Sequence, residues 1–424
     1  MKDIMQVVRS FDGVCPTCGQ HHRTAIEDVR IGSGLVNQVG EILTENNFCS
    51  TLLLVADRNT LRAADGILES LSDFNVEMHV YDDIRVATME HVEQLEALIA
   101  DRDISVLSVG SGSVNDPCRL ATARQNKKLC IFATAPSMDG FASYSSPIVK
   151  DGFKFSYAAK SPEVIIGDTA ILAAAPVALK SSGFGDMVAK YPALVDWQVA
   201  ALLSDEVCCE RIAKLTRTAI DRLMQMADRV TQNDEETAGA IFASLLLTGI
   251  GMSFAQNSRP ASGAEHIIAH LMECIELRDG IIPNYHGEDV GVCTLFTLGF
   301  YENLAGMETI TPQEDAPDWE DIYRYYGSMA DDVRAINAKN PQIAQVTPDA
   351  LRRMWPQIRE IIASVPSRAQ CEDAMRRAGC KLTVADIGKS QQLFDDCVHY
   401  SPYMRNRLTL LRLRQMLDAD INVR

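Results

Sequence analysis

The strongest constraint on the fold is an alternation of short apolar runs with amphipathic helical patterns, from about residue 24 to residue 170. The run TLLLVA at 51–56 has the length and composition of a buried strand. Helical patterns at 61–71 and 89–100 separate it from similar runs. Such alternation predicts a parallel sheet covered by helices on both faces, with ligands at the carboxyl ends of the strands. The further strands are expected at 76–81, 104–109, 129–133 and 164–166.

Past about residue 170 the pattern changes, because apolar residues recur every three or four positions in long stretches without a convincing strand. The expected architecture is therefore an α/β domain with a Rossmann-like parallel sheet at 1–172, followed by an all-helical domain at 173–424. The acidic stretch 308–321 is expected to be a loop. The basic, amphipathic stretch 404–417 is expected to dock on the domain as a helix, with a partner-binding segment as the alternative. The main helices are expected at 192–203, 206–230, 235–252, 262–277 and 290–304.

Composition narrows the class of protein. The chain has 424 residues, of which 47% are hydrophobic, so it can bury sizeable cores. We expect neither a membrane span nor a signal peptide, and we expect a cytoplasmic protein. The net charge of -17 argues against nucleic acid as a partner and favours a small-molecule substrate. The twelve cysteines are scattered, which favours a reducing compartment over a disulfide framework.

Polar turns follow three of the expected strands. Gly110-Ser111-Gly112-Ser113-Val114-Asn115-Asp116 precedes a helical stretch, an arrangement whose free amides suit a pyrophosphate. The turn lacks the third glycine of the dinucleotide fingerprint. The second turn, at 134–143, is rich in hydroxyls and holds one carboxylate, although an ordinary loop has a similar composition. Asp57 ends the strand at 51–56.

Two imidazoles are expected on one face of the helix at 262–277. Ser262 and Glu265 form a capping-box pattern, and His266 and His270 follow four residues apart. His286 comes sixteen residues after His270. Two histidines and a carboxylate are a common ligand set for an open catalytic site of the zinc type, with a purely structural histidine pair as the alternative.

A cysteine-rich turn lies near the N-terminus. Cys15-Pro16-Thr17-Cys18 is followed by His21 and His22, which together resemble a zinc knuckle. Only half of a structural site is visible, because a second, well-spaced pair of ligands is missing from the sequence nearby. An exposed hairpin turn is the alternative.

Taken in order, five motifs resemble those of the sn-glycerol-1-phosphate dehydrogenase family, in its bacterial branch. This family belongs to the superfamily of iron-dependent alcohol dehydrogenases, glycerol dehydrogenase and dehydroquinate synthase, and it implies a dehydroquinate synthase-like fold with the site between the two domains. In the bacterial branch the cysteine-rich turn need not mean zinc. The motifs are Gly110 to Asp116, Thr134 to Gly140, Gly183 to Asp186, Glu265 to His270 and His286 to Gly291.

The resemblance implies roles for particular residues. Asp186, His266 and His286 would bind one divalent metal. Zinc, nickel and iron all suit such a ligand set, and we expect zinc or nickel rather than iron. Asp139, Asp186 and His270 would contact the substrate, and His270 and Asp186 would act in catalysis. NAD is favoured over NADP, because Asp57 at the ribose would repel a 2′-phosphate. The implied cofactor-binding residues are Asp57, Gly110, Ser111, Gly112, Ser113, Val114, Asn115, Asp116, Thr134, Ser137 and Ser143.

The activity implied is NAD(P)H-linked reduction of dihydroxyacetone phosphate to sn-glycerol 1-phosphate, with hydride delivered to a metal-polarised carbonyl. A glycerol dehydrogenase or a dehydroquinate synthase-like cyclase on the same scaffold is the alternative. Lys150, Lys154 and Lys160 are candidates to bind the substrate phosphate, and solvated surface lysines are the other interpretation. Members of the family are commonly homodimers or larger, so a homo-oligomer is expected.

Overall fold

The computed structural model describes residues 4–338 and 341–417. The first part of the chain is built around a parallel sheet of six strands, in the spatial order β3-β10-β7-β6-β4-β5. Two antiparallel hairpins, β1-β2 and β8-β9, lie outside it. The strands are β1 Gly13–Val14, β2 His21–His22, β3 Asp28–Gly32, β4 Thr51–Asp57, β5 Asn75–Tyr81, β6 Ser105–Gly110, β7 Leu129–Ala133, β8 Ser145–Lys150, β9 Phe153–Ala158 and β10 Val164–Asp168.

The sheet forms because its central strands can bury side chains on both faces. In β4, Leu53 and Val55 enter one hydrophobic core, while Leu52 and Leu54 enter the core on the other face. This alternation follows from the two-residue period of a strand. The five strands expected from the sequence are confirmed, with bounds that differ by at most two residues at each end.

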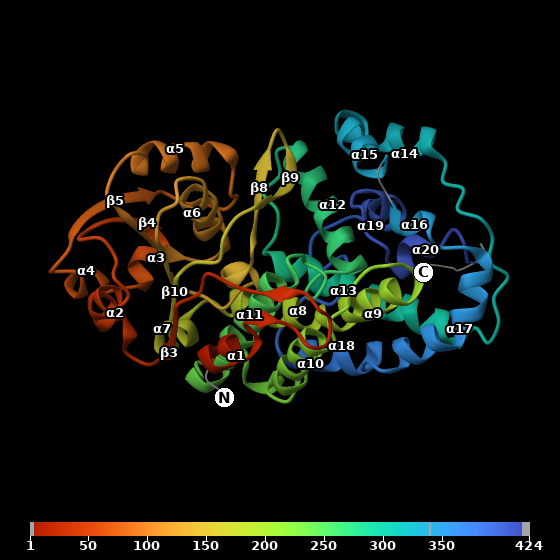
Figure 1. The fold of residues 1–424 in the computed structure, drawn as a ribbon, viewed down its shortest axis with the longest axis horizontal. Coiled ribbons are helices and arrows are strands. Elements are labelled where there is room, and N and C mark those ends of the chain that lie inside the picture. Colours follow the sequence, from red (N-terminus) through yellow and green to blue (C-terminus); the bar gives the residue numbers. More distant parts are fainter. Residues whose placement is uncertain (1–3, 339–340, 418–424) are drawn as a thin grey trace.

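Helices cover the sheet and form most of the remaining described chain (Figure 1). After β10 the described residues form no strand, so the expected change to helical structure is confirmed. The helices are α1 Ile4–Phe11, α2 Val39–Glu45, α3 Arg58–Ala63, α4 Ile67–Ser70, α5 Met89–Ile99, α6 Gly112–Arg124, α7 Thr169–Ala174, α8 Val177–Val188, α9 Lys190–Leu203, α10 Glu210–Met224, α11 Glu235–Ala255, α12 Ala264–Arg278, α13 His286–Gly306, α14 Trp319–Tyr326, α15 Ala330–Asn337, α16 Pro341–Ala344, α17 Pro348–Ala363, α18 Arg368–Arg377, α19 Gln391–Tyr400 and α20 Leu410–Leu413.

Helix α11 lies in the hydrophobic core that also contains Leu53 and Val55 of β4. By length and composition it could cross a membrane, but 89% of its most apolar window is buried inside the fold. It is apolar all round because it packs against α7, α8 and α10 and against the turn at Gly140–Ala142. A core helix of a large domain satisfies the same test of length and hydropathy as a membrane span.

Some local expectations are wrong in detail. The helix expected at 61–71 is broken into α3 and α4, because Gly66 adopts a φ of 91° between them. Residues 404–417 dock on the fold as expected, but only α20 is helical there. The capping box at Ser262 does not form. Gly263 is the N-cap of α12, and the Ser262 hydroxyl instead accepts a hydrogen bond from Arg407 at 2.8 Å.

Candidate active site

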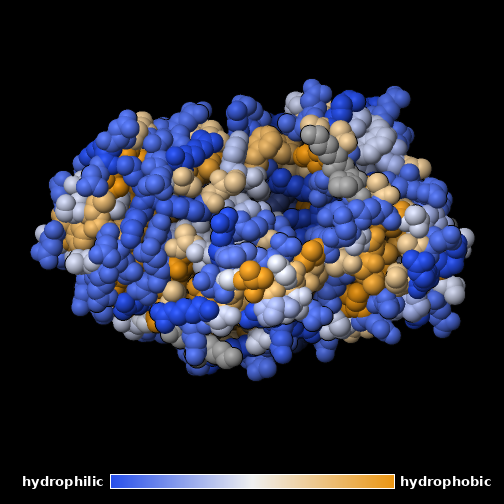
Figure 2. All heavy atoms as spheres, in the orientation of Figure 1, coloured by the Kyte–Doolittle hydropathy of each residue, from blue (hydrophilic) through white to orange (hydrophobic). Residues whose placement is uncertain are grey.

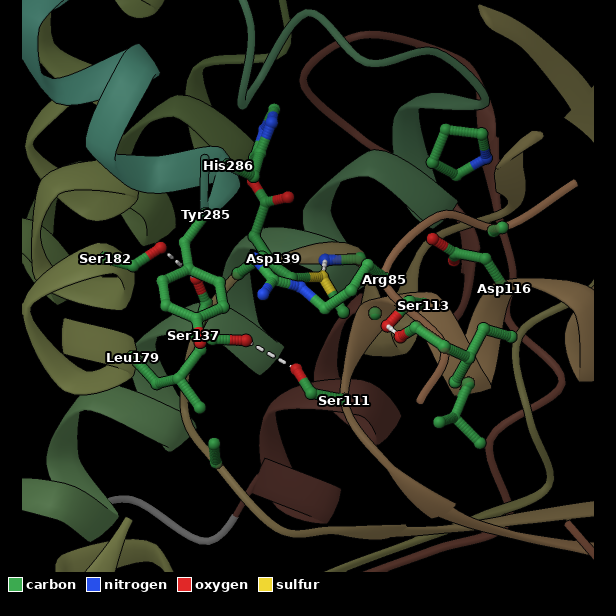
Figure 3. Close-up of a pocket in the computed structure, with 18 of the residues that line it drawn as sticks. Arg85, Ser111, Ser113, Asp116, Ser137, Asp139, Leu179, Ser182, Tyr285 and His286 are labelled. Carbon is green, nitrogen blue, oxygen red and sulfur yellow. Dashed lines mark hydrogen bonds between the residues drawn. The ribbon is translucent and has the colours of Figure 1, made fainter. Parts of the chain in front are cut away.

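A cavity of about 910 Å³ lies between the carboxyl edge of the sheet and helices α8, α12 and α13 (Figure 3). Figure 2 shows a hydrophilic hollow near the centre of one face of the molecule. Most of the residues expected at a site do line this cavity. Gly110, Asn115 and Asp186 lie behind its wall instead. The expected residues that line it are Asp57, Ser111, Gly112, Ser113, Val114, Asp116, Thr134, Ser137, Asp139, Ser143, His266, His270 and His286.

One wall is the turn between β6 and α6. The strand ends at Gly110 and the helix begins at Gly112, so the first amides of α6 face the cavity. Ser111, the N-cap, makes no side-chain capping bond, and these amides keep their capacity for an anion. Behind the wall, Asn115 supports the turn by accepting a hydrogen bond from Ser108 at 2.6 Å.

The turn after β7 lies beside the first turn. The amide of Thr134 donates to the carbonyl of Gly110 at 3.2 Å, and the hydroxyls of Ser111 and Ser137 are 2.5 Å apart (Figure 3). Asp57 reaches the same cavity from β4. Its carboxylate caps α3 by accepting from the amides of Asn59 and Thr60, so its position is fixed.

Asp186, His266 and His286 converge although 100 residues separate the first from the last. One ligand atom from each lies within 4.8 Å of the others, which suits a single metal ion. Close packing of backbone brings them together. A Cβ atom on Gly287 would lie 1.9 Å from the carbonyl oxygen of Ser182, so only glycine lets α13 approach α8 this closely.

Glu265 orients His266, and the sequence reasoning did not assign it this role. Its carboxylate lies 2.8 Å from Nδ1 of His266, while Nε2 of that ring lies 3.3 Å from Asp186. Both Glu265 and His266 are buried. A carboxylate on the far nitrogen fixes the tautomer and turns the other nitrogen toward the cluster, as at many metal sites.

Lys190 is a second residue that the sequence reasoning missed. Its fully buried Nζ lies 2.7 Å from Asp139 and 2.5 Å from Asp186. Burial opposes the charge on Lys190, but the two carboxylates outweigh that effect and raise its pKa. Burial likewise opposes ionisation of Asp186, and Lys190 and the neighbouring histidines hold its pKa well below the usual range. Asp186 is therefore an anion, as a metal ligand must be.

His270 faces the cavity next to the cluster, and its ring is stacked on His286 with 5.5 Å between centroids. Burial, together with the charge of Lys154, lowers the pKa of His270 well below the usual value. The ring is therefore neutral near pH 7 and can both donate and accept a hydrogen bond.

Of the three candidate lysines, only Lys154 lines the cavity, where Glu273 holds it at 2.8 Å. Lys150 is exposed at the end of β8, and Lys160 pairs with Glu163. Opposite, the guanidinium of Arg85 lies 4.8 Å from the ring centroid of Tyr285, a contact between the sheet side and the helical side of the cavity (Figure 3). Neither Arg85 nor Tyr285 stood out in the sequence.

One family model matches part of the chain, and several solved structures share its fold. Residues 30–176 match the iron-containing alcohol dehydrogenase family. The fold resembles an NADH-dependent butanol dehydrogenase from Thermotoga maritima, with a TM-score of 0.59, 13% identity and 92% of each chain covered. It also resembles a glycerol dehydrogenase from Schizosaccharomyces pombe, with a TM-score of 0.55 and 19% identity, over 95% of this chain and 99% of the other.

Two relatives carry the same name. A glycerol-1-phosphate dehydrogenase from Halalkalibacterium halodurans is 27% identical over 97% of this chain and 98% of its own length. Another, from Methanosarcina mazei, is 32% identical over 64% of this chain and 75% of its own length. The 32% identity extends over three quarters of the Methanosarcina protein, which is enough to assign the family. The chain belongs to the glycerol-1-phosphate dehydrogenase family.

Proposed function

We propose that this protein catalyses the metal-dependent, NAD(P)H-linked reduction of dihydroxyacetone phosphate to sn-glycerol 1-phosphate. The observation that carries the proposal is one cavity bordered by two sites. On one side is the uncapped N-terminus of α6, and on the other is the cluster of Asp186, His266 and His286. An anion-binding turn and a metal-type ligand set facing one space suit a reaction between a dinucleotide and a metal-bound ketone.

The ligand set fits a divalent ion. Two imidazoles and one carboxylate leave a positive charge and an open coordination position, and Glu265 orients one imidazole. When bound, such an ion polarises a carbonyl and stabilises the alkoxide, and reduced nicotinamide supplies the hydride. Zinc and nickel are our favoured ions.

The chain's own residues bind and orient the reactants. Ser111, Gly112 and Ser113 present the amides that would bind the cofactor pyrophosphate, and Ser137 and Ser143 would line the nicotinamide side. Asp57 would meet the adenosine ribose, with NAD as the favoured cofactor. The placement of Asp57 at the cavity wall supports this role.

Substrate contacts are proposed for Asp139 and His270. Both line the cavity, and His270 borders the metal cluster. As a neutral imidazole, His270 would donate to or accept from a substrate hydroxyl and relay the proton that the alkoxide needs. Asp139 is held in place by Lys190 and would accept a hydrogen bond from another hydroxyl.

Lys154 is our candidate for the substrate phosphate. Lys154→Ala should raise KM for dihydroxyacetone phosphate about tenfold or more, because a hydrogen bond to a charged group contributes about 1.5–3 kcal/mol. Steady-state kinetics would measure this. Lys150→Ala, at an exposed position outside the cavity, should leave KM unchanged. An equal increase of KM with unphosphorylated dihydroxyacetone in Lys154→Ala would contradict a role at the phosphate.

Three further proposals concern the domains, the oligomeric state and the cellular location. We propose that residues 1–172 form a dinucleotide-binding domain and that residues 173–424 form a metal- and substrate-binding domain. The end of the sheet at β10 supports this division. We propose a homodimer or larger homo-oligomer from the family resemblance. We propose a cytoplasmic location from the sequence, which suggests neither a membrane span nor a signal peptide.

The test is reduction of dihydroxyacetone phosphate by NADH, on chelated protein resupplied separately with zinc, nickel or ferrous iron. Strong preference for the phosphorylated ketone, restored by one metal, with sn-glycerol 1-phosphate as the product, is the expected result. Activity with free dihydroxyacetone alone would identify a glycerol dehydrogenase instead. No reduction of either ketone with any metal would remove the dehydrogenase assignment.

A further inference from the structure

Four metal-binding side chains meet away from the cavity. Cys15, Cys18 and His22 come from the N-terminal hairpin, and Cys209 comes from the helical part of the chain. One ligand atom from each lies within 4.8 Å of all the others. None of the four lines the cavity of the active site. The sequence shows only half of this cluster, because 194 positions separate Cys15 from Cys209.

The distances within the cluster match the edges of a metal tetrahedron. The two sulfurs of Cys15 and Cys209 are 3.8 Å apart, and the sulfur of Cys18 is 3.3 Å from Nε2 of His22. Zinc–sulfur bonds of about 2.3 Å and zinc–nitrogen bonds of about 2.0 Å give tetrahedral edges of about 3.8 Å between sulfurs and about 3.5 Å between sulfur and nitrogen. A disulfide needs about 2.05 Å, so the sulfurs of Cys15 and Cys209 are not bonded to each other.

The hairpin is folded so that its ligands face one point. The amide of Cys15 donates to the carbonyl of Gln20 at 2.8 Å, and the amide of Gly19 donates to the carbonyl of Cys15 at 2.9 Å. Gly19 adopts a φ of 71°, a conformation that glycine reaches without strain. The chain therefore reverses directly after Cys18, and His22 returns to its side.

The fourth ligand stands at the start of a long helix. Cys209 is the N-cap of α10, where the positive end of the helix dipole favours a thiolate. Figure 1 shows α1 and the N-terminal hairpin lying near α10 and α11. A metal bound here would therefore join the first part of the chain to the helical part.

Charge at the cluster is balanced. Three thiolates around a divalent ion carry one net negative charge, and Nη1 of Arg211 lies 3.9 Å from the sulfur of Cys15. Arg211 is held there by a hydrogen bond of 2.9 Å to the carbonyl of Ser10 and by the ring of Phe11, 4.4 Å away. A fixed cation beside a thiolate site stabilises the deprotonated ligands.

Three of the four ligands are shielded from water, and the fourth, Cys18, is half-buried. Cys15, His22 and Cys209 are 1%, 1% and 3% exposed. The ring of His22 is stacked with Phe11 and Phe254, at 6.0 and 5.5 Å between centroids. Four protein ligands without an open position, in a mostly buried and aromatic setting, are typical of a structural zinc site.

We propose that Cys15, Cys18, His22 and Cys209 bind a structural zinc ion that fastens the N-terminal hairpin to helices α10 and α11. Each cysteine gives up its thiol proton to solvent when the ion binds. Soft thiolates select zinc here, whereas the carboxylate and two imidazoles of the active site form a harder set. The protein then carries metal ions of two different functions.

The test compares neighbouring cysteines. Wild-type protein treated with a mild chelator should keep about one zinc ion per chain, because a closed site of four ligands releases its ion slowly. Cys209→Ser should lose that zinc and unfold at a lower temperature. Cys208→Ser is the matched control, since Cys208 is adjacent in sequence but outside the cluster, and it should keep the zinc. Cobalt-loaded wild type and Cys208→Ser should show thiolate-to-cobalt charge-transfer absorption, which Cys209→Ser should lack.

A second pair of variants tests the site independently, in case a variant of the first pair does not fold. His22→Asn should lose the zinc and His21→Asn should keep it, because His21 is exposed and outside the cluster. The proposal would be overturned if Cys209→Ser and wild type contained equal zinc and the cobalt-loaded wild type showed no thiolate-to-cobalt absorption. So would metal-free protein in which titration finds about two thiols missing, because that identifies a disulfide. Loss of dehydrogenase activity alone bears only on the proposed function, since the metal content is measured independently.

Discussion

His286→Ala protein is expected to have no measurable dehydrogenase activity and to bind no metal ion at Asp186 and His266. The reason is geometric, because the three ligand atoms lie within 4.8 Å of one another and the variant leaves only two. An open site with two protein ligands does not retain a divalent ion well. Nickel content after loading and removal of free metal, measured beside kcat, would check this expectation.

His270→Ala is the matched control for that experiment. His270 lies beside His286 and lines the same cavity, but it is not part of the Asp186 cluster. It should keep the metal and lose about 10²-fold or more in kcat, in line with the usual contribution of a positioned acid or base. Unchanged turnover in His270→Ala would contradict its proposed role. If His286→Ala retained both activity and metal, the catalytic metal would have to bind at other residues.

Lys190→Met should lower the free energy of unfolding by about 3–5 kcal/mol, the usual cost of removing one partner of a buried ion pair. Lys190 is fully buried and stands between Asp139 and Asp186, so methionine leaves two carboxylates without a cation. Methionine has similar length and cannot carry a charge. Urea unfolding of the metal-free protein, followed by circular dichroism, would measure the change.

A double variant separates charge from packing in this prediction. Asp139→Asn removes one of the two carboxylates, so Lys190→Met/Asp139→Asn should recover at least about 1 kcal/mol relative to the single variant. Divalent metal should also stabilise Lys190→Met more than wild type, because it supplies the missing positive charge. A loss below about 1 kcal/mol in Lys190→Met would show that Lys190 does not balance these carboxylates.

Much of the sheet could be predicted because its signal is local. The runs that became β4, β6 and β7 are mostly apolar and almost entirely buried, as is typical of strands covered on both faces. Strand β3 was missed, because its residues DVRIG are half-buried at the edge of the sheet and carry no apolar run. The β8-β9 hairpin was missed for a similar reason, since it mixes polar, aliphatic and aromatic residues and carries no continuous apolar run.

Part of the candidate site could likewise be predicted from local sequence, and part could not. The turn at Gly110 could be found in the sequence, because glycines and hydroxyls directly after a strand are themselves the signal. Asp186, His266 and His286 were identified through family resemblance, and the structure places them together. The burial of Lys190 could not be predicted from the sequence, because it depends on the turn after β7 packing against α8 and α9.

The sequence by itself determined the local elements, the change from sheet to helices, and the residue types able to bind a metal and a dinucleotide. Periodicity of two or of three to four residues is a property of neighbouring positions, so it can be read along the chain. Only the tertiary structure decided that Lys190 lies between two carboxylates, that Glu265 orients His266 and that Cys209 completes the cluster of Cys15. The contacts of Lys190 with Asp139 and of Cys209 with Cys15 join distant segments, whereas Glu265 and His266 are neighbours whose side-chain orientation depends on packing. These arrangements follow from close packing of helices and backbone rather than from any pattern along the chain.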